Sequence, residues 1–125
     1  MEDLKFAKQV SQTVAYGILK DFVENYVDKE KLQKYGLMWN SFVQKPKCVP
    51  MEEIRDIPIL PEDRVFFYDE REKSLYATKM EEVITYILEL EPWDQVDACV
   101  FNREMKWVLA VTHEDALLFL EENVR

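Results

Sequence analysis

The chain has 125 residues and a mass of 15.0 kDa, and its 48% hydrophobic and 33% charged residues are the composition of a single globular domain. Its 16 Lys and Arg stand against 25 Asp and Glu, which gives a formal net charge of -9 and a pI near 4.7. This balance argues against a sequence-independent nucleic-acid binder and against binding to anionic membranes, because both need a cationic surface.

The first 45 residues form the predicted helical part of one domain that spans residues 1–125. Apolar residues recur at helical spacing over residues 3–27, and Asp28 is the expected N-cap of a second helical segment that continues to Phe42. The prolines at 46 and 50 end that segment. The first stripe consists of Leu4, Ala7, Val10, Val14, Ile18, Phe22 and Tyr26.

Residues 46–61 are predicted to be a proline-rich extended connector whose apolar residues dock onto the core, namely Val49, Met51, Ile54, Ile57 and Ile59. From residue 62 the period changes to that of strands. Residues 64–68 and 74–78 predict a hairpin with its turn at 69–73, and residues 95–101 and 106–112 predict a second hairpin. Between them, Met80 to Leu88 recur at helical spacing, with Thr78 as a cap. The tail from His113 to Arg125 fits either a strand or a terminal helix.

These elements predict an α+β fold in which N-terminal helices pack on one face of a mainly antiparallel sheet of four to five strands, with one inserted helix. Charge is unequal along the chain. Residues 1–50 hold 8 Lys and Arg against 6 Asp and Glu, whereas residues 51–125 hold 8 against 19. The acidic half is either a solvated face or a patch complementary to a basic protein.

The N-terminus, MEDLKFAKQV, lacks the basic start and apolar run of a secretory signal, and no apolar stretch approaches the roughly 20 residues that cross a bilayer. The chain is therefore predicted to be cytoplasmic, with no membrane partner. Cys48 and Cys99 are interpreted as reduced structural thiols.

Enzymatic chemistry would have to use His113, because a Ser or Cys nucleophile needs a base and this is the one His. Cys99 and Thr112 are its nearest candidates, but no turn or oxyanion loop accompanies them. A more ordinary role is a hydrogen bond from His113 to Glu114 or Asp115. No metal-ligand spacing is present, and Gly17 and Gly36 are isolated within helical stretches, so neither a cofactor nor a phosphate-binding loop is predicted.

Surface recognition is what the sequence favours. Trp39 and Trp107 fall in periodic segments and are expected in the core, whereas Trp93 follows Pro92 in an acidic loop and either caps the core or anchors a basic partner. The predicted partner-binding residues are Asp69, Glu70, Glu72, Glu89, Glu91, Trp93, Asp94, His113 and Glu114.

The segment WDQVDACVFNREMKWVLAVTHED, residues 93–115, resembles small α+β proteins suspected to be immunity proteins of polymorphic-toxin and contact-dependent growth inhibition systems. Its pattern rests on Asp97, Phe101, Trp107, Thr112, His113 and Glu114, whereas Asn102 departs from the acidic residue expected there. The resemblance implies a cytoplasmic bacterial protein that blocks a toxin domain, often a nuclease.

The resulting hypothesis is a non-catalytic immunity protein that binds and neutralises a basic toxin domain through its acidic surface. A regulatory or adaptor domain without a toxin partner is one alternative, and a small enzyme that uses His113 is another. The sequence leaves monomer and homodimer open.

Overall fold

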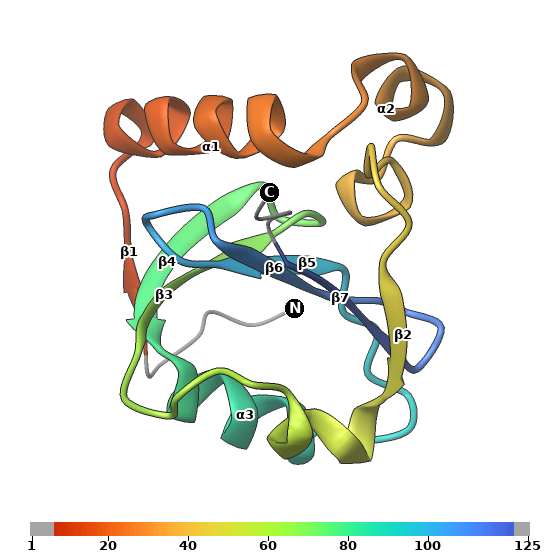
Figure 1. Ribbon diagram of the computed structural model, residues 1–125. Helices are drawn as coiled ribbons and strands as arrows, with labels where there is room; N and C mark the ends of the chain where they lie inside the picture. The colour runs from red at the N-terminus through yellow and green to blue at the C-terminus, as the bar shows by residue number, and fades with distance from the viewer. Residues whose placement is uncertain (1–6, 122–125) are drawn as a thin grey trace.

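The computed structural model describes residues 7–121, and a seven-stranded antiparallel sheet forms its middle layer (Figure 1). The strand order is β1-β4-β3-β5-β6-β7-β2. The fold class is therefore α+β, as predicted, with more strands than the four to five expected. The strands are β1 (Lys8–Gln9), β2 (Lys47–Pro50), β3 (Arg64–Asp69), β4 (Ser74–Lys79), β5 (Ala98–Phe101), β6 (Trp107–Val111) and β7 (Ala116–Glu121).

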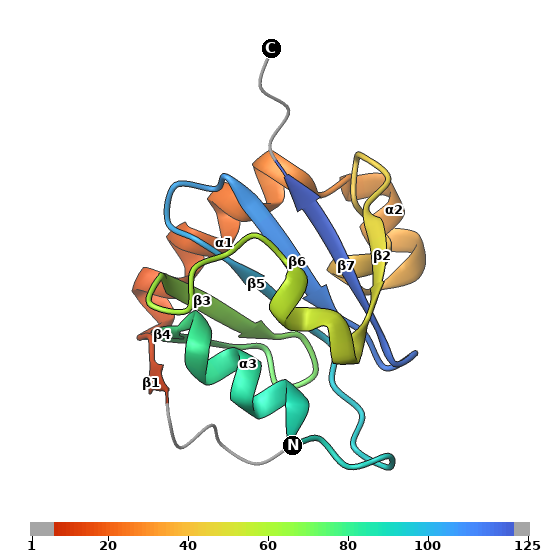
Figure 2. The same cartoon turned by 60° about the horizontal axis from the view of Figure 1, so that its bottom comes forward.

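Helices cover both faces of this sheet, which corrects the prediction that they would lie on one face. Helices α1 (Gln12–Tyr26) and α2 (Lys29–Tyr35) lie on one side with the 3-10 turn η1 (Met38–Asn40), whereas α3 (Met80–Leu88) and the 3-10 segment η2 (Met51–Asp56) lie on the other (Figures 1 and 2). The reason is that all residues of β5 and β6 are buried, so the central strands are apolar on both faces and need cover on both.

The N-terminal stripe becomes a shorter helix than predicted, because residues 8 and 9 pair with β4 as a strand and residues 3–6 lie outside the described part. Helix α1 buries Ala15, Phe22 and Tyr26 on the sheet, and the Phe22 ring stacks on Phe101 with centroids 4.4 Å apart. Val14, predicted to be in the stripe, is 53% exposed. The Tyr26 hydroxyl donates to the Met105 carbonyl oxygen at 2.6 Å, which fixes the C-terminal end of α1 to the turn between β5 and β6.

Asp28 caps α2 as predicted, since its carboxylate accepts from the amides of Glu30 and Lys31. The predicted second segment divides at Gly36, whose φ of 79° ends α2 in the left-handed conformation. A 3-10 turn with the buried Trp39 follows it.

The predicted connector contributes more than a link, because Lys47–Pro50 pairs with β7 as the edge strand β2. Val49, Ile54, Ile57 and Ile59 are buried against the sheet, as expected, and Met51 packs partly on them. Both predicted hairpins are present, and the undecided tail forms the strand β7 as far as it is described. Lys79 takes the N-cap position of α3 instead of Thr78, whose buried hydroxyl has no hydrogen-bond partner among the described residues.

Candidate functional site

Three connections meet at one end of the sheet. They are the β3–β4 turn, the loop from α3 to β5, and the β6–β7 turn, all of which lie at the same end because the strands are antiparallel neighbours. The nine predicted partner-binding residues all fall in these connections or beside them. The structure thus brings together segments that are far apart in the sequence, and we call this region the acidic end.

Asp97 holds the acidic end together from within. It is 2% exposed, and its Oδ1 accepts from the Trp39 indole Nε1 at 2.9 Å and lies 2.8 Å from His113 Nδ1. Its Oδ2 accepts from Arg71 Nε at 2.8 Å. One carboxylate therefore joins η1, the β3–β4 turn and the β6–β7 turn.

The protonation of Asp97 follows from these contacts. Burial by itself would raise its pKa, but the hydrogen bonds from His113 and Arg71 outweigh burial and keep the pKa of Asp97 below its ordinary value. The carboxylate is therefore ionised at neutral pH. Hydrogen bonds to an ionised carboxylate are stronger than those to a neutral carboxyl group, so ionisation strengthens the contacts that Asp97 makes with its donors.

Asp69 and Glu70, two of the predicted partner-binding residues, accept hydrogen bonds inside the protein, and Asp69 is buried whereas Glu70 is half-buried. Asp69 is 1% exposed, and its Oδ1 accepts from the amides of Arg71 and Glu72 within the hairpin turn. Glu70 accepts from the Met38 amide at 2.6 Å and from the Trp39 amide at 3.3 Å. Burial raises the pKa of both carboxyl groups.

The remaining predicted acids and Trp93 lie on the outside. Glu72, Glu89, Glu91, Asp94 and Glu114 are exposed, and the Trp93 side chain is 76% exposed, so it does not cap the core. Asp94 Oδ2 accepts from the Glu91 amide at 2.9 Å, which stabilises the loop that carries Trp93. A cavity of about 250 Å³ between this loop and the β6–β7 turn is lined in part by Glu91, Asp94 and Asp115.

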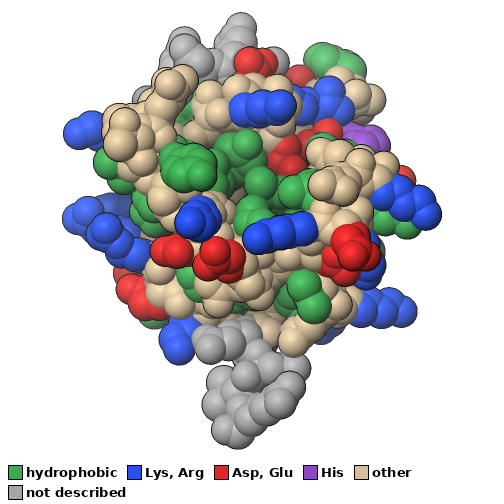
Figure 3. Space-filling view, turned by 90° about the horizontal axis from the view of Figure 1, so that it is seen from above, with side chains coloured by type: hydrophobic (Ala, Val, Ile, Leu, Met, Phe, Trp, Pro, Cys, Tyr) green, Lys and Arg blue, Asp and Glu red, His purple; other side chains and the backbone are tan. Residues whose placement is uncertain are grey.

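The predicted hydrogen bond from His113 to Glu114 or Asp115 is not the one observed. His113 Nδ1 instead lies 2.8 Å from Asp97 Oδ1. Its ring meets that of Trp39 edge-on, with centroids 5.7 Å apart, and its side chain is 37% exposed. In the space-filling view from the α1 side, the histidine lies at the edge of the molecule with acidic side chains next to it (Figure 3).

The Asp97–His113 pair has the form of two members of a catalytic triad, but the candidate nucleophiles are engaged elsewhere. Cys99 is fully buried, its Sγ lies 3.8 Å from Glu70, and burial raises the pKa of its thiol well above the ordinary value. The Thr112 hydroxyl donates to the Ala116 carbonyl oxygen at 2.8 Å.

Over residues 7–121, no three His, Cys, Asp or Glu side chains are grouped so as to hold a metal ion. In the same part of the chain, no helix has the length and apolar character needed to cross a membrane. Both cysteines are free, with Cys48 exposed.

The residues behind the sequence resemblance mainly build this end and its sheet. Phe101 is fully buried and Trp107 is 8% exposed, while Thr112 closes the β6–β7 turn and Asp97 anchors the network. Arg71 and Trp39, which the sequence reasoning did not assign to the site, provide two of the donors to Asp97. A buried Asp next to a strand was the available signal, because such a residue requires donors from elsewhere in the chain.

Comparison with known proteins adds nothing to this geometry, since no family model, curated protein or solved structure matches the chain.

Proposed function

We propose that this protein is a non-catalytic binding protein that neutralises a basic toxin domain through its acidic end. The observation that carries the proposal is that the exposed Trp93 and the exposed acids belong to three connections at the same end of the sheet. The buried Asp97 stabilises this end by accepting hydrogen bonds from Trp39 and Arg71. Residues that contribute most to binding at protein interfaces are enriched in Trp, and acidic neighbours favour a basic partner.

The chemistry of the acidic end supports a protein partner over a small substrate. The loops that carry the acids are held by hydrogen bonds to Asp69, Asp94 and Asp97, so little backbone entropy is lost when a partner binds. The formal net charge of -9 attracts a cationic partner over distances beyond direct contact and raises its association rate.

A nuclease toxin is the kind of partner that fits this surface. A domain that holds nucleic-acid phosphates must be basic, and an acidic protein can cover the same surface and thereby block it. The resemblance of residues 93–115 to suspected immunity proteins points to the same partner class, in a bacterial cytoplasm.

The test is a capture experiment followed by growth rescue. The tagged protein is incubated with lysate of its own organism at about 0.15 M and about 0.5 M salt, because screening separates charge-driven from packed contacts. Captured proteins are identified by mass spectrometry, and any toxin domain among them is expressed with and without this protein.

Two variants localise the interface. Glu91→Lys/Glu114→Lys reverses two exposed acids at the acidic end, and Asp21→Lys/Glu24→Lys makes the same charge change on the exposed side of α1. We expect the first variant to slow association by about tenfold or more at low salt, and the second to slow it much less. Trp93→Ala should mainly accelerate dissociation.

The proposal is supported if wild type rescues growth from a captured basic toxin domain and the acidic-end variant does not. Capture of a partner without toxicity, lost in the same variant, would make the protein an adaptor instead. Capture that is equal for both charge variants would place the interface elsewhere and refute the role of the acidic end.

A further inference from the structure

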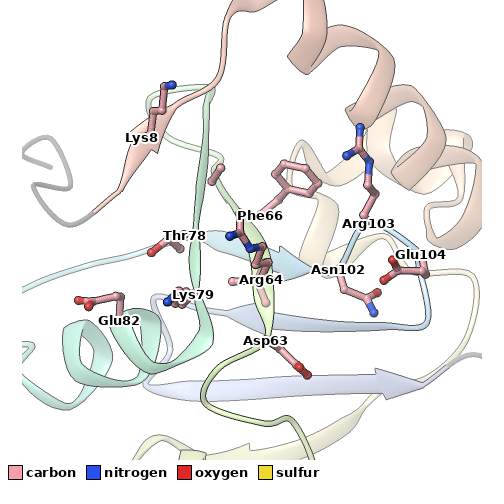
Figure 4. Close-up of a pocket in the computed structure, with 12 residues that line it drawn as sticks. Lys8, Asp63, Arg64, Phe66, Thr78, Lys79, Glu82, Asn102, Arg103 and Glu104 are labelled. Carbon is pink, nitrogen blue, oxygen red and sulfur yellow. The ribbon is translucent and has the colours of Figure 1, made fainter.

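The end of the sheet opposite to the acidic end contains the larger cavity, of about 870 Å³. It lies where β3 begins and β4 ends, with β1 on one side and the β5–β6 turn on the other (Figure 4). Four cations from separate segments line it, and we call this region the cationic end. They are Lys8, Arg64, Lys79 and Arg103.

The strand register brings these cations to one face of the sheet. Arg64 lies directly opposite Lys79, and two residues further along, Phe66 lies opposite Ala77, which in turn pairs with Lys8. Because side chains alternate between faces, all of them project to the side that α1 covers elsewhere. On the other side of β3, Phe66 pairs with Phe101 of β5, and Arg103 lies two residues after Phe101 in the β5–β6 turn.

This arrangement is costly without an anion. Like charges directly opposite each other on neighbouring strands are destabilising. Over residues 7–121, none of the four cations has a carboxylate within ion-pair distance, and none uses its side chain in a hydrogen bond. Three acids also line the cavity, namely Asp63, Glu82 and Glu104, so its lining has four cations against three carboxylates. In Figure 4 Glu82 lies beside Lys79 and Glu104 beside Asn102, but neither is within ion-pair distance of a cation in the part of the chain that the structure describes.

The cavity also offers groups that suit the rest of a ligand. Phe66 is half-buried and contributes a ring next to Arg64 (Figure 4). Asn102 also lines the cavity, and because its Oδ1 accepts from the Lys106 amide at 2.9 Å, its side-chain NH2 group is the part that can donate to a ligand. The volume lies within the range of small-molecule sites in proteins, roughly 300–1,000 Å³.

We propose that this cavity binds a phosphorylated small molecule, whose phosphate group lies against Arg64 and Lys79 and whose ring lies over Phe66. A phosphate group neutralises the opposed pair with charge-assisted hydrogen bonds, and Arg presents a planar fork that matches phosphate oxygens. The absence of a glycine-rich loop and the overall negative charge do not oppose this, because the cations are concentrated locally on one sheet face.

The experiment is isothermal titration calorimetry at low ionic strength with inorganic pyrophosphate, ATP and adenosine as probes. Pyrophosphate tests the cations alone, adenosine tests the ring alone, and ATP tests both. We expect ATP to bind more tightly than pyrophosphate and adenosine to bind far more weakly than either. In Arg64→Gln/Lys79→Gln, ATP affinity should fall by about tenfold or more, because two charge-assisted contacts are lost.

A matched variant, Lys20→Gln/Arg55→Gln, removes two exposed cations outside the cavity and should bind ATP within about twofold of wild type. Phe66→Leu should reduce the advantage of ATP over pyrophosphate while leaving pyrophosphate binding unchanged.

The proposal is overturned if neither pyrophosphate nor ATP binds more tightly than about 1 mM, or if both charge variants weaken binding equally. It is also overturned if sedimentation shows that Arg64→Gln/Lys79→Gln abolishes self-association while phosphate compounds do not bind, because a second copy would then occupy the cavity. None of these outcomes depends on toxin capture, which tests the acidic end.

Discussion

The two ends of the central sheet use charge in opposite ways. At the acidic end, the buried carboxylates are fully engaged, since Asp97, Asp69 and Glu70 accept hydrogen bonds from backbone and side-chain donors. At the cationic end, four Lys and Arg side chains face one cavity without a carboxylate partner in residues 7–121. Hydrogen bonds to carboxyl groups thus hold the chain together at one end, whereas the cations at the other end have no such partners in the described residues.

This difference separates structural charge from functional charge. A charged group that is buried and paired is explained by the fold, whereas exposed acids around Trp93 and opposed cations at Arg64 are not. The exposed acids around Trp93 and the cavity of the cationic end are therefore the two surfaces that we propose bind a partner or ligand.

Loss of the central carboxylate at the acidic end should have the largest effect on stability. Asp97→Ala leaves Trp39 Nε1 without its acceptor and separates Arg71 and His113 from their anion. We expect the free energy of unfolding to fall by about 2–4 kcal/mol, less than for a fully buried pair because Arg71 and His113 are partly exposed. Urea denaturation measures this, with the exposed Asp56→Ala as control. A loss below about 0.5 kcal/mol would show that the network does not hold this end together.

Removing only the Trp39 donor to Asp97 should lower the free energy of unfolding by less than removing Asp97 itself. Trp39→Phe keeps an aromatic ring but removes the indole N–H that donates to Asp97, so we expect a loss of about 1–2 kcal/mol beyond the change in packing. Trp107→Phe is the matched control, because both Trp residues are 8% exposed and the Trp107 indole donates no hydrogen bond to any residue within 7–121. Equal losses in the two variants would exclude a contribution from the hydrogen bond.

The same contrast explains how far the sequence could predict the molecule. Local patterns identified both hairpins, α3 and the Asp28 cap, because their signals lie within a few neighbouring residues. The edge strands β1 and β2 were missed, since they are defined by free backbone groups on β4 and β7 that no local pattern reveals. Cover on both faces was missed for a related reason, although the apolar runs of β5 and β6 contained the signal.

At the candidate site, the sequence singled out residues of three connections that the structure brings to one end of the sheet, but it did not predict the contacts of these residues. Glu70 and Glu72 look alike in the run DERE, yet one reaches the backbone of η1 and the other is exposed. Only the tertiary position of Met38 and Trp39 distinguishes them. The cationic end was not predicted at all, because Lys8, Arg64, Lys79 and Arg103 become neighbours only through strand pairing.

The pH dependence of stability should identify Glu70 as a buried acid that is costly to ionise. Burial raises its pKa in the folded state, so its contribution to stability is lost as pH rises from the unfolded pKa through the folded one. Glu70→Gln removes that loss, and the stability of the variant relative to wild type should therefore increase as the pH rises from about 4.3, the ordinary pKa of a glutamate, towards neutral. Asp97 has the opposite sign, because its pKa is lowered in the folded state, so that its ionised form stabilises the fold and this contribution is lost as the pH falls. Urea titrations of both proteins over this range measure the difference, and a flat difference would contradict the assignment.

The cationic end should show the smallest effect and the opposite sign to the acidic end. Arg64→Gln/Lys79→Gln relieves the repulsion of a directly opposed pair, so in low salt and without ligand we expect stability to rise by about 0.2–1 kcal/mol. The gain should disappear near 1 M salt, where the screening length is only about 3 Å. Arg71→Gln instead removes a cation that is bonded to Asp97, and it should lower stability under the same conditions. If both changes lowered stability, the cations at the cavity would have to be paired in solution, and there would be no unbalanced charge left for an anion to neutralise.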